Sequence, residues 1–168
     1  MTYAKTVEDF LERHHLAHEV VSHAPTGSSI ESARAAQIPP ERIAKGVLLN
    51  AEGKYVLAVT RADCHLNLGE LRRQLQAQVG LATREDLESV FDDCALGAVP
   101  PLGPAYGIAS IWDDALVQEP DLYFELGDHT RLVHLRTQDF LALLGNERHG
   151  SFSEPTGAAH PSRWALSI

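Results

Sequence analysis

The stretch Ala44-Lys45-Gly46-Val47-Leu48-Leu49 decides how this chain folds. Apart from its lysine it is apolar, and residues 55–60 (YVLAVT) have the same character. The connection between them, residues 50–54 (NAEGK), is short and contains a glycine, which a tight turn between antiparallel strands favours. Two apolar, partly β-branched runs joined so closely predict a β-hairpin.

Short helices and short strands alternate on both sides of this hairpin. Capping residues and apolar side chains three and four positions apart predict helices over residues 6–15, 28–36, 68–76, 83–89 and 137–144. Short apolar runs predict strands over residues 16–22, 79–82, 108–111, 122–126 and 131–135. Several of these strands follow one another too closely for parallel crossovers, so the pattern favours an α+β fold with a mixed, curved sheet.

The length of 168 residues is typical of one domain. From Asn146 onward the chain is rich in Gly, Ser and Pro and lacks periodicity, so we expect a domain over residues 1–145 and a flexible tail over 146–168. No apolar run is long enough to span a bilayer, and residues 1–6 do not resemble a signal peptide, so we expect a cytoplasmic protein without membrane contact. Cys64 and Cys94 form neither a disulfide framework nor a zinc-ligand spacing.

The charge balance limits the kinds of partner. The chain has 14 Lys and Arg against 23 Asp and Glu, a net charge of −9. Proteins that hold long stretches of nucleic acid by the phosphates usually present a basic surface, so this composition argues against a DNA-binding protein. It still allows a small positive pocket that holds the end of a single strand.

Lys45 is the strongest single candidate for a functional residue. A lysine at the start of a strand is most often solvated, where it guards against edge pairing. Its position before an apolar run also allows an inward ammonium, which would contact a phosphate or a carbonyl oxygen on which negative charge develops. The sequence alone leaves both interpretations open.

Two further segments combine glycine or proline with possible chemistry. Residues 97–103 (GAVPPLG) form a stiff loop whose glycine allows a ligand close to the backbone, although such loops are also common connectors. His129 lies in the turn Gly127-Asp128-His129-Thr130 between two predicted strands, and imidazole exchanges protons near neutral pH. A surface turn is the ordinary alternative for this histidine. No metal-ligand set and no phosphate or dinucleotide fingerprint is present, so we expect neither metal nor cofactor.

Taken in this order, the Ala44-Lys45 strand, the Ala62-Asp63 segment, the Gly97-x-x-Pro100 loop and the Gly127-Asp128-His129 turn resemble the YbaK and prolyl-tRNA synthetase-associated editing domain family. The resemblance extends from the first helix to Leu144. It implies a mixed, barrel-like sheet surrounded by helices. It also implies hydrolysis of the ester between an amino acid and the terminal adenosine of a mischarged tRNA, without a metal.

Site residues follow from the same resemblance. Lys45, the backbone at Gly97 and His129 would act on the ester. Residues that would bind the substrate are Thr26, Ser29, Pro100, Pro101 and Asp128. The partners would be the aminoacyl-tRNA acceptor end, with tRNA-Pro one candidate, and an aminoacyl-tRNA synthetase. A chain of this length has no room for a synthetase, so we expect it to act in trans.

Two other functional classes stay open at this stage. A non-catalytic module would use the same pocket to bind a nucleotide, a tRNA end or a synthetase, and an acidic surface suits protein contact. A hydrolase of small esters or thioesters would use His129 as a base. Neither the edited amino acid nor the oligomeric state can be read from the sequence.

Overall fold

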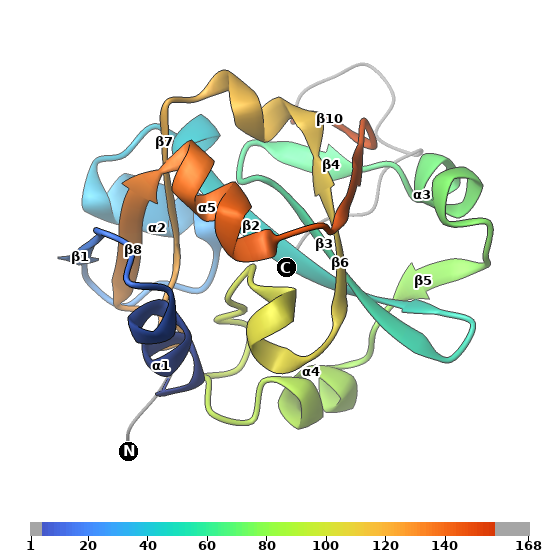
Figure 1. Cartoon of the computed structure of the whole chain (residues 1–168), viewed down its shortest axis with the longest axis horizontal. Helices are drawn as coiled ribbons and strands as arrows, with labels where there is room; N and C mark the ends of the chain where they lie inside the picture. Colours follow the sequence, from blue (N-terminus) through green and yellow to red (C-terminus); the bar gives the residue numbers. More distant parts are fainter. Residues whose placement is uncertain (1–4, 157–168) are drawn as a thin grey trace.

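The computed structural model describes residues 5–156, in which short helices surround one large mixed sheet (Figure 1). Five α-helices are present in this part of the chain: α1 (Lys5–His14), α2 (Ser29–Ala36), α3 (Leu68–Leu75), α4 (Arg84–Val90) and α5 (Thr137–Leu144). The strands are β1 (Glu19–Ser22), β2 (Ile43–Ala51), β3 (Lys54–Arg61), β4 (Cys64–Leu66), β5 (Val79–Leu81), β6 (Ala109–Asp113), β7 (Asp121–Glu125), β8 (Arg131–Arg136), β9 (Arg148–Gly150) and β10 (Ser153–Pro155). Three 3-10 turns, η1 (Pro40–Arg42), η2 (Gly103–Tyr106) and η3 (Asp114–Gln118), complete it.

The predicted hairpin is the centre of the sheet. Strands β2 and β3 pair antiparallel from Ala44↔Arg61 to Ala51↔Lys54, and the sheet runs in the order β1-β8-β7-β2-β3-β6-β9. The β2–β7, β3–β6 and β6–β9 pairs are parallel and the others antiparallel, which confirms a mixed α+β fold. Within the described residues β1 and β9 are open edges, so the sheet does not close into a barrel.

Local sequence explains where the helices begin. Ser28 caps α2 by accepting from the backbone of Glu31, and Thr83 and Asp86 form a reciprocal capping box at α4. Helix α5 has no side-chain cap: Thr137 is its first residue, and the Thr137 hydroxyl donates to the Glu119 carbonyl.

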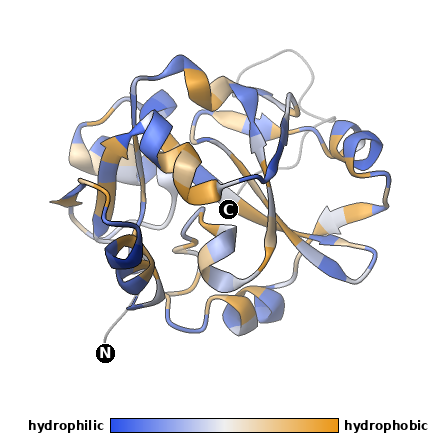
Figure 2. Cartoon of the chain, in the orientation of Figure 1, coloured by the Kyte–Doolittle hydropathy of each residue, from blue (hydrophilic) through white to orange (hydrophobic). Residues whose placement is uncertain are grey.

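The two faces of β2 contribute to different cores. Ala44 and Leu48 belong to the largest cluster, together with side chains from α1, α4 and α5, whereas Ile43 packs with Ala33 of α2. Figure 2 shows hydrophobic colour along the central strands and in the later turns of α5. Because successive side chains of a strand point to opposite faces, Lys45 emerges on the face that α2 covers.

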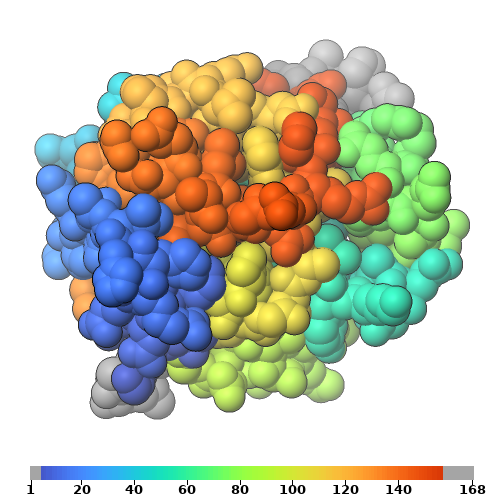
Figure 3. Space-filling view, viewed as in Figure 1, coloured from blue at the N-terminus to red at the C-terminus, as the bar shows by residue number. Residues whose placement is uncertain are grey.

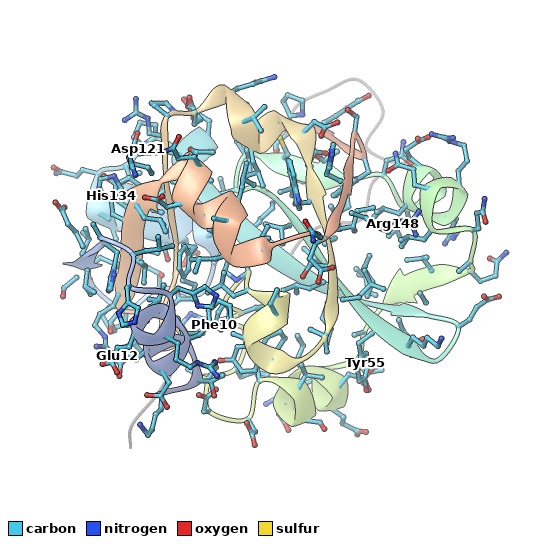
Figure 4. The ribbon with its side chains drawn as sticks, in the orientation of Figure 1. Phe10, Glu12, Tyr55, Asp121, His134 and Arg148 are labelled. Carbon is cyan, nitrogen blue, oxygen red and sulfur yellow. The ribbon has the colours of Figure 1, made fainter. Side chains whose placement is uncertain are left out.

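The expectation of a loose tail is wrong for residues 147–156, which we call the C-terminal segment. Its strand β9 runs parallel to β6, and β10 pairs antiparallel with β4. Figure 3 shows the segment crossing the surface after α5, and in Figure 4 the side chain of Arg148 reaches toward α3. The prediction failed because a three-residue strand shows no periodicity. Residues 157–168 lie outside the described part of the chain. For these residues the division into a domain and a flexible tail stays a prediction.

In the described residues, no helix is long and apolar enough to cross a membrane.

Candidate functional site

Lys45 is a buried lysine near the start of β2, only 6% exposed. Its Nζ donates to the carbonyl oxygens of Ala62, at 3.2 Å, and Cys64, at 2.5 Å. Ala62 lies in the turn between β3 and β4, and Cys64 is the first residue of β4. An ammonium carries three N–H donors, and the third has no partner among the described residues. The side chain is therefore held in place with one donor left for a ligand.

Burial lowers the pKa of Lys45 from its ordinary value of 10.5 to about 8, although the negative charge of nearby Asp63 opposes the change. Removal from water disfavours the charged form of an amine. At pH 7 the ammonium still predominates. Lys45 is thus a cation whose charge is only weakly hydrated, and a hydrogen bond from such a cation to a developing negative charge is strong.

A cavity of about 400 Å³ opens at Lys45 between α2, the β3–β4 turn and the end of the C-terminal segment. It is lined by Ser28, Ser29, Ile30, Arg34, Lys45, Ala62, Asp63, His65, Pro155 and Thr156. Of the residues predicted to contact substrate, Ser29 lies in this cavity with Lys45. Burial, followed by the positive charge of Lys45, lowers the pKa of His65 and keeps that imidazole neutral.

His129 occupies the turn between β7 and β8 with a left-handed backbone (φ +63°). Its Nε2 lies 2.6 Å from the carbonyl oxygen of Leu96, and because a carbonyl only accepts, Nε2 carries the proton in this tautomer. The backbone N–H of Thr26 donates to the His129 carbonyl at 3.3 Å. The imidazole is therefore fixed against the loop before Gly97, and its Nδ1 has no hydrogen-bond partner among the described residues.

Gly97 lies beside His129. A Cβ at this position would lie 3.8 Å from Cε1 of His129, and the backbone is left-handed (φ +80°), which favours glycine. Gly97 lines a second cavity, of about 210 Å³, with Cys94 and residues of α4. Pro100 and Pro101 are buried and line neither of these two cavities.

The predicted site residues fall into two groups on opposite faces of β2. Lys45 and Ser29 form one group, and the proline loop with His129 forms the other. A Cβ on Gly46 would come within 3.2 Å of the Pro101 Cα, so the proline loop covers the face opposite to Lys45. The cavity at Lys45 is lined by neither Gly97 nor His129. Thr26 connects the two regions, since its backbone bonds His129 and its hydroxyl lies 2.7 Å from that of Ser32 in α2.

Asp128 has a different environment from the one predicted for a substrate-binding residue. Its Oδ1 accepts from the backbones of Thr130 and Arg131, and Oδ2 accepts from Nε of Arg131 at 2.6 Å. Burial disfavours its ionisation, but these hydrogen bonds prevail and hold the pKa of Asp128 below its ordinary range. Its oxygens are engaged in shaping the turn.

Glu125, which sequence reasoning missed, supports the same turn. One of its carboxylate oxygens accepts from the backbones of Gly127, Asp128 and His129. The position of an acid at the end of a predicted strand, two residues before a glycine, was the only signal for it.

The residues around Lys45 were also missed as a group. Asp63, His65 and Arg34 line its cavity, although only the Ala62-Asp63 pair had been noticed as a motif. Arg61 binds Asp63 through two hydrogen bonds, which leaves Arg34 as the guanidinium of this cavity without an acidic partner among the described residues. The site thus offers a buried ammonium, an exposed guanidinium, a neutral imidazole and three hydroxyls.

Among the described residues, no three His, Cys, Asp or Glu side chains gather closely enough to hold a metal ion.

Comparison with known proteins gives this arrangement a context. Residues 23–143 match the family described as the aminoacyl-tRNA editing domain. Proline–tRNA ligase of Geobacillus thermodenitrificans (strain NG80-2) is 34% identical over 117 residues, which are 68% of this chain and 19% of the ligase. The ligase of Geobacillus kaustophilus (strain HTA426) is 37% identical over 81 residues, 48% of this chain and 14% of the ligase. The chain thus spans less than a fifth of these curated relatives.

Solved structures show the same fold. A crystal structure described as that of a candidate trans-editing enzyme for prolyl tRNA synthetase superposes with a TM-score of 0.78 at 24% identity, covering 90% of this chain and 96% of that one. A crystal structure of a hypothetical protein gives the same score at 19% identity, covering 89% and 100%.

Proposed function

We infer the function from the fact that this chain belongs to the aminoacyl-tRNA editing domain family, and we propose that it hydrolyses the ester of a mischarged tRNA. The family predicted from the sequence is confirmed. The proposed substrate is the aminoacylated acceptor end, the proposed action is in trans to a synthetase, and tRNA-Pro is the first tRNA to test because the relatives are proline–tRNA ligases.

The observation that carries this proposal is the buried ammonium of Lys45 with one unused N–H donor beside a cavity. Ester hydrolysis passes through a tetrahedral intermediate whose oxygen is negative. A fixed donor in a site poor in water stabilises that charge more than it stabilises the neutral ester, which accelerates the reaction. The two carbonyl oxygens that hold Nζ in place remove the need for it to reorganise.

The proposed reaction needs no protein nucleophile. A water oxygen adds to the ester carbonyl carbon while Lys45 donates to the carbonyl oxygen. The bond to the ribose oxygen then breaks, and that oxygen takes a proton from the water, relayed by the neighbouring ribose hydroxyl. Ser29 and Arg34 are placed to orient the substrate at the rim of the same cavity.

Gly97 and His129 lie outside the Lys45 cavity, so for them we propose a role in positioning the terminal nucleoside in place of direct action on the ester. They are connected to the Lys45 cavity through Thr26, which touches the His129 carbonyl and the start of α2. We assign this histidine to orientation and not to proton abstraction, because it does not line the cavity that contains Lys45.

The test is a panel of mischarged tRNAs, with release of the amino acid measured under single-turnover conditions. We expect the wild-type protein to deacylate at least one of them. Tight binding to charged tRNA without any hydrolysis would contradict the enzyme and support a non-catalytic module.

Lys45→Ala is expected to lower the deacylation rate by at least about a hundredfold, since loss of one transition-state donor typically has that effect. The matched control is Lys54→Ala, in the same hairpin but exposed on β3. Circular dichroism would establish that both variants fold. A folded Lys45→Ala variant with wild-type turnover would contradict the proposed role of Lys45.

A further inference from the structure

The C-terminal segment forms one wall of the cavity at Lys45, although it lies beyond the residues that match the editing-domain family. The match ends at residue 143, whereas Pro155 and Thr156 line the cavity. The family match therefore does not account for this side of the site.

Buried contacts fix the segment to the body of the protein. Phe152 is 2% exposed, and both its backbone N–H and the hydroxyl of Ser153 donate to Oδ2 of the buried Asp113. On the side of α3, Arg148 donates to the Gln74 carbonyl and the Gln74 amide donates to the Ser151 carbonyl. A wall held at this many points resists displacement by a substrate.

Cys64 of β4 contacts both the C-terminal segment and Lys45. It pairs with Pro155 of β10, and its carbonyl oxygen accepts a hydrogen bond from Nζ of Lys45. Thr156 donates to the Asp63 carbonyl at 2.7 Å, and Asn67 donates to the Phe152 carbonyl at 2.7 Å. Hydrogen-bonded and non-hydrogen-bonded pairs alternate in an antiparallel ladder, so the intervening pair Pro155↔Cys64 is of the non-hydrogen-bonded kind.

Two consequences follow from that register. A proline is tolerated at position 155, because its missing N–H would have pointed away from β4. The Cys64 carbonyl likewise points away from β10, and it accepts from Nζ of Lys45 instead. The same short ladder therefore positions the ammonium and places Pro155 and Thr156 beside it.

We propose that Pro155 and Thr156 limit the size of the aminoacyl group that the Lys45 cavity accepts. This inference rests on the proposed deacylase function. Pro155 contributes a rigid ring and Thr156 a β-branched side chain on a hydrogen-bonded backbone, so neither can retreat as a long flexible side chain would.

The experiment compares kcat/KM for tRNAs that carry a small, a medium and a large aliphatic amino acid. Thr156→Gly keeps the backbone bond to Asp63 and removes the side chain, so the ratio of large to small substrate should rise about tenfold, the effect of one or two methyl groups in a pocket. Thr156→Phe should lower the same ratio by a similar factor. In Thr156→Gly, kcat/KM for the smallest substrate should change far less than kcat/KM for the largest one.

Glu154→Ala is the matched control, because this exposed neighbour does not line the cavity. We expect its ratio to equal that of the wild-type protein. The size-limiting role of Pro155 and Thr156 would be overturned if the wild type, the two Thr156 variants and Glu154→Ala gave equal ratios of large to small substrate. A uniform change of KM for every substrate would also overturn it. Either result would leave the deacylase function intact. A wild-type protein inactive on every charged tRNA would instead contradict the proposed function, and this inference with it.

Discussion

At the scale of one residue, the burial of Lys45 links function to stability. Its third donor serves a ligand only if the side chain stays inside the protein, where the charge is poorly hydrated. Burying an ammonium costs free energy, because the charge loses its hydration. The carbonyl oxygens of Ala62 and Cys64 offset part of this cost.

This penalty predicts how stability depends on pH. Because the pKa of Lys45 is lowered from 10.5 to about 8, the unfolded chain binds more protons than the folded one between these values. The free energy of unfolding should therefore rise with pH across this window, by roughly 3 kcal/mol at most. The measurement is urea unfolding of the wild-type protein and of Lys45→Met from pH 8 to 10.5, with the difference between them plotted against pH.

The variant removes the titrating group, so contributions from other residues cancel in that difference. A difference that stays constant across the window would show that Lys45 titrates normally in the folded protein.

At the scale of an element, the two faces of β2 contact different parts of the protein. Lys45 serves the cavity under α2, and the next residue, Gly46, lets the proline loop approach the opposite face. A side chain at Gly46 would meet Leu57 at 3.1 Å and the backbone of Pro101 at 3.2 Å. The backbone of a proline cannot yield as a flexible side chain can.

Gly46→Ala should therefore destabilise the protein by about 1–3 kcal/mol, the usual effect of overpacking a well-packed core. Gly80→Ala in β5 is the matched control, since a Cβ there meets nothing within 4 Å, and we expect a change within about 0.5 kcal/mol. Urea unfolding of both variants at one pH provides the comparison. Equal stability of the two variants would mean that the loop does not press on β2.

At the scale of the whole molecule, the net charge of −9 limits the contact with RNA that the proposed function would involve. A deacylase that holds only the acceptor end neutralises one or two phosphates, for which Arg34 is the available cation of the cavity, since Lys45 is assigned to the ester carbonyl oxygen. Between 50 and 200 mM salt we expect kcat/KM to fall by less than about tenfold, whereas proteins with six to ten phosphate contacts lose roughly a thousandfold or more. A steep salt dependence would indicate a much larger contact with the RNA body.

Much of the fold could be predicted from the sequence. The hairpin of β2 and β3, all five helices and most strands follow from periodicity, turn residues and caps, which act between neighbours in the chain. Strands β4, β9 and β10 were missed, because three residues are too few for a pattern and their stability comes from partners far away in sequence.

The sequence by itself identified the segments that we propose carry chemistry: a lysine at the start of a core strand, a glycine loop and a histidine turn. Only the tertiary structure decided that Lys45 faces α2 while the proline loop covers the other side of β2, and that Pro155 and Thr156 close the lysine's cavity. The reason is physical. Periodicity reports which residues of a strand share a face, but which element covers that face depends on contacts between residues as distant as Cys64 and Pro155.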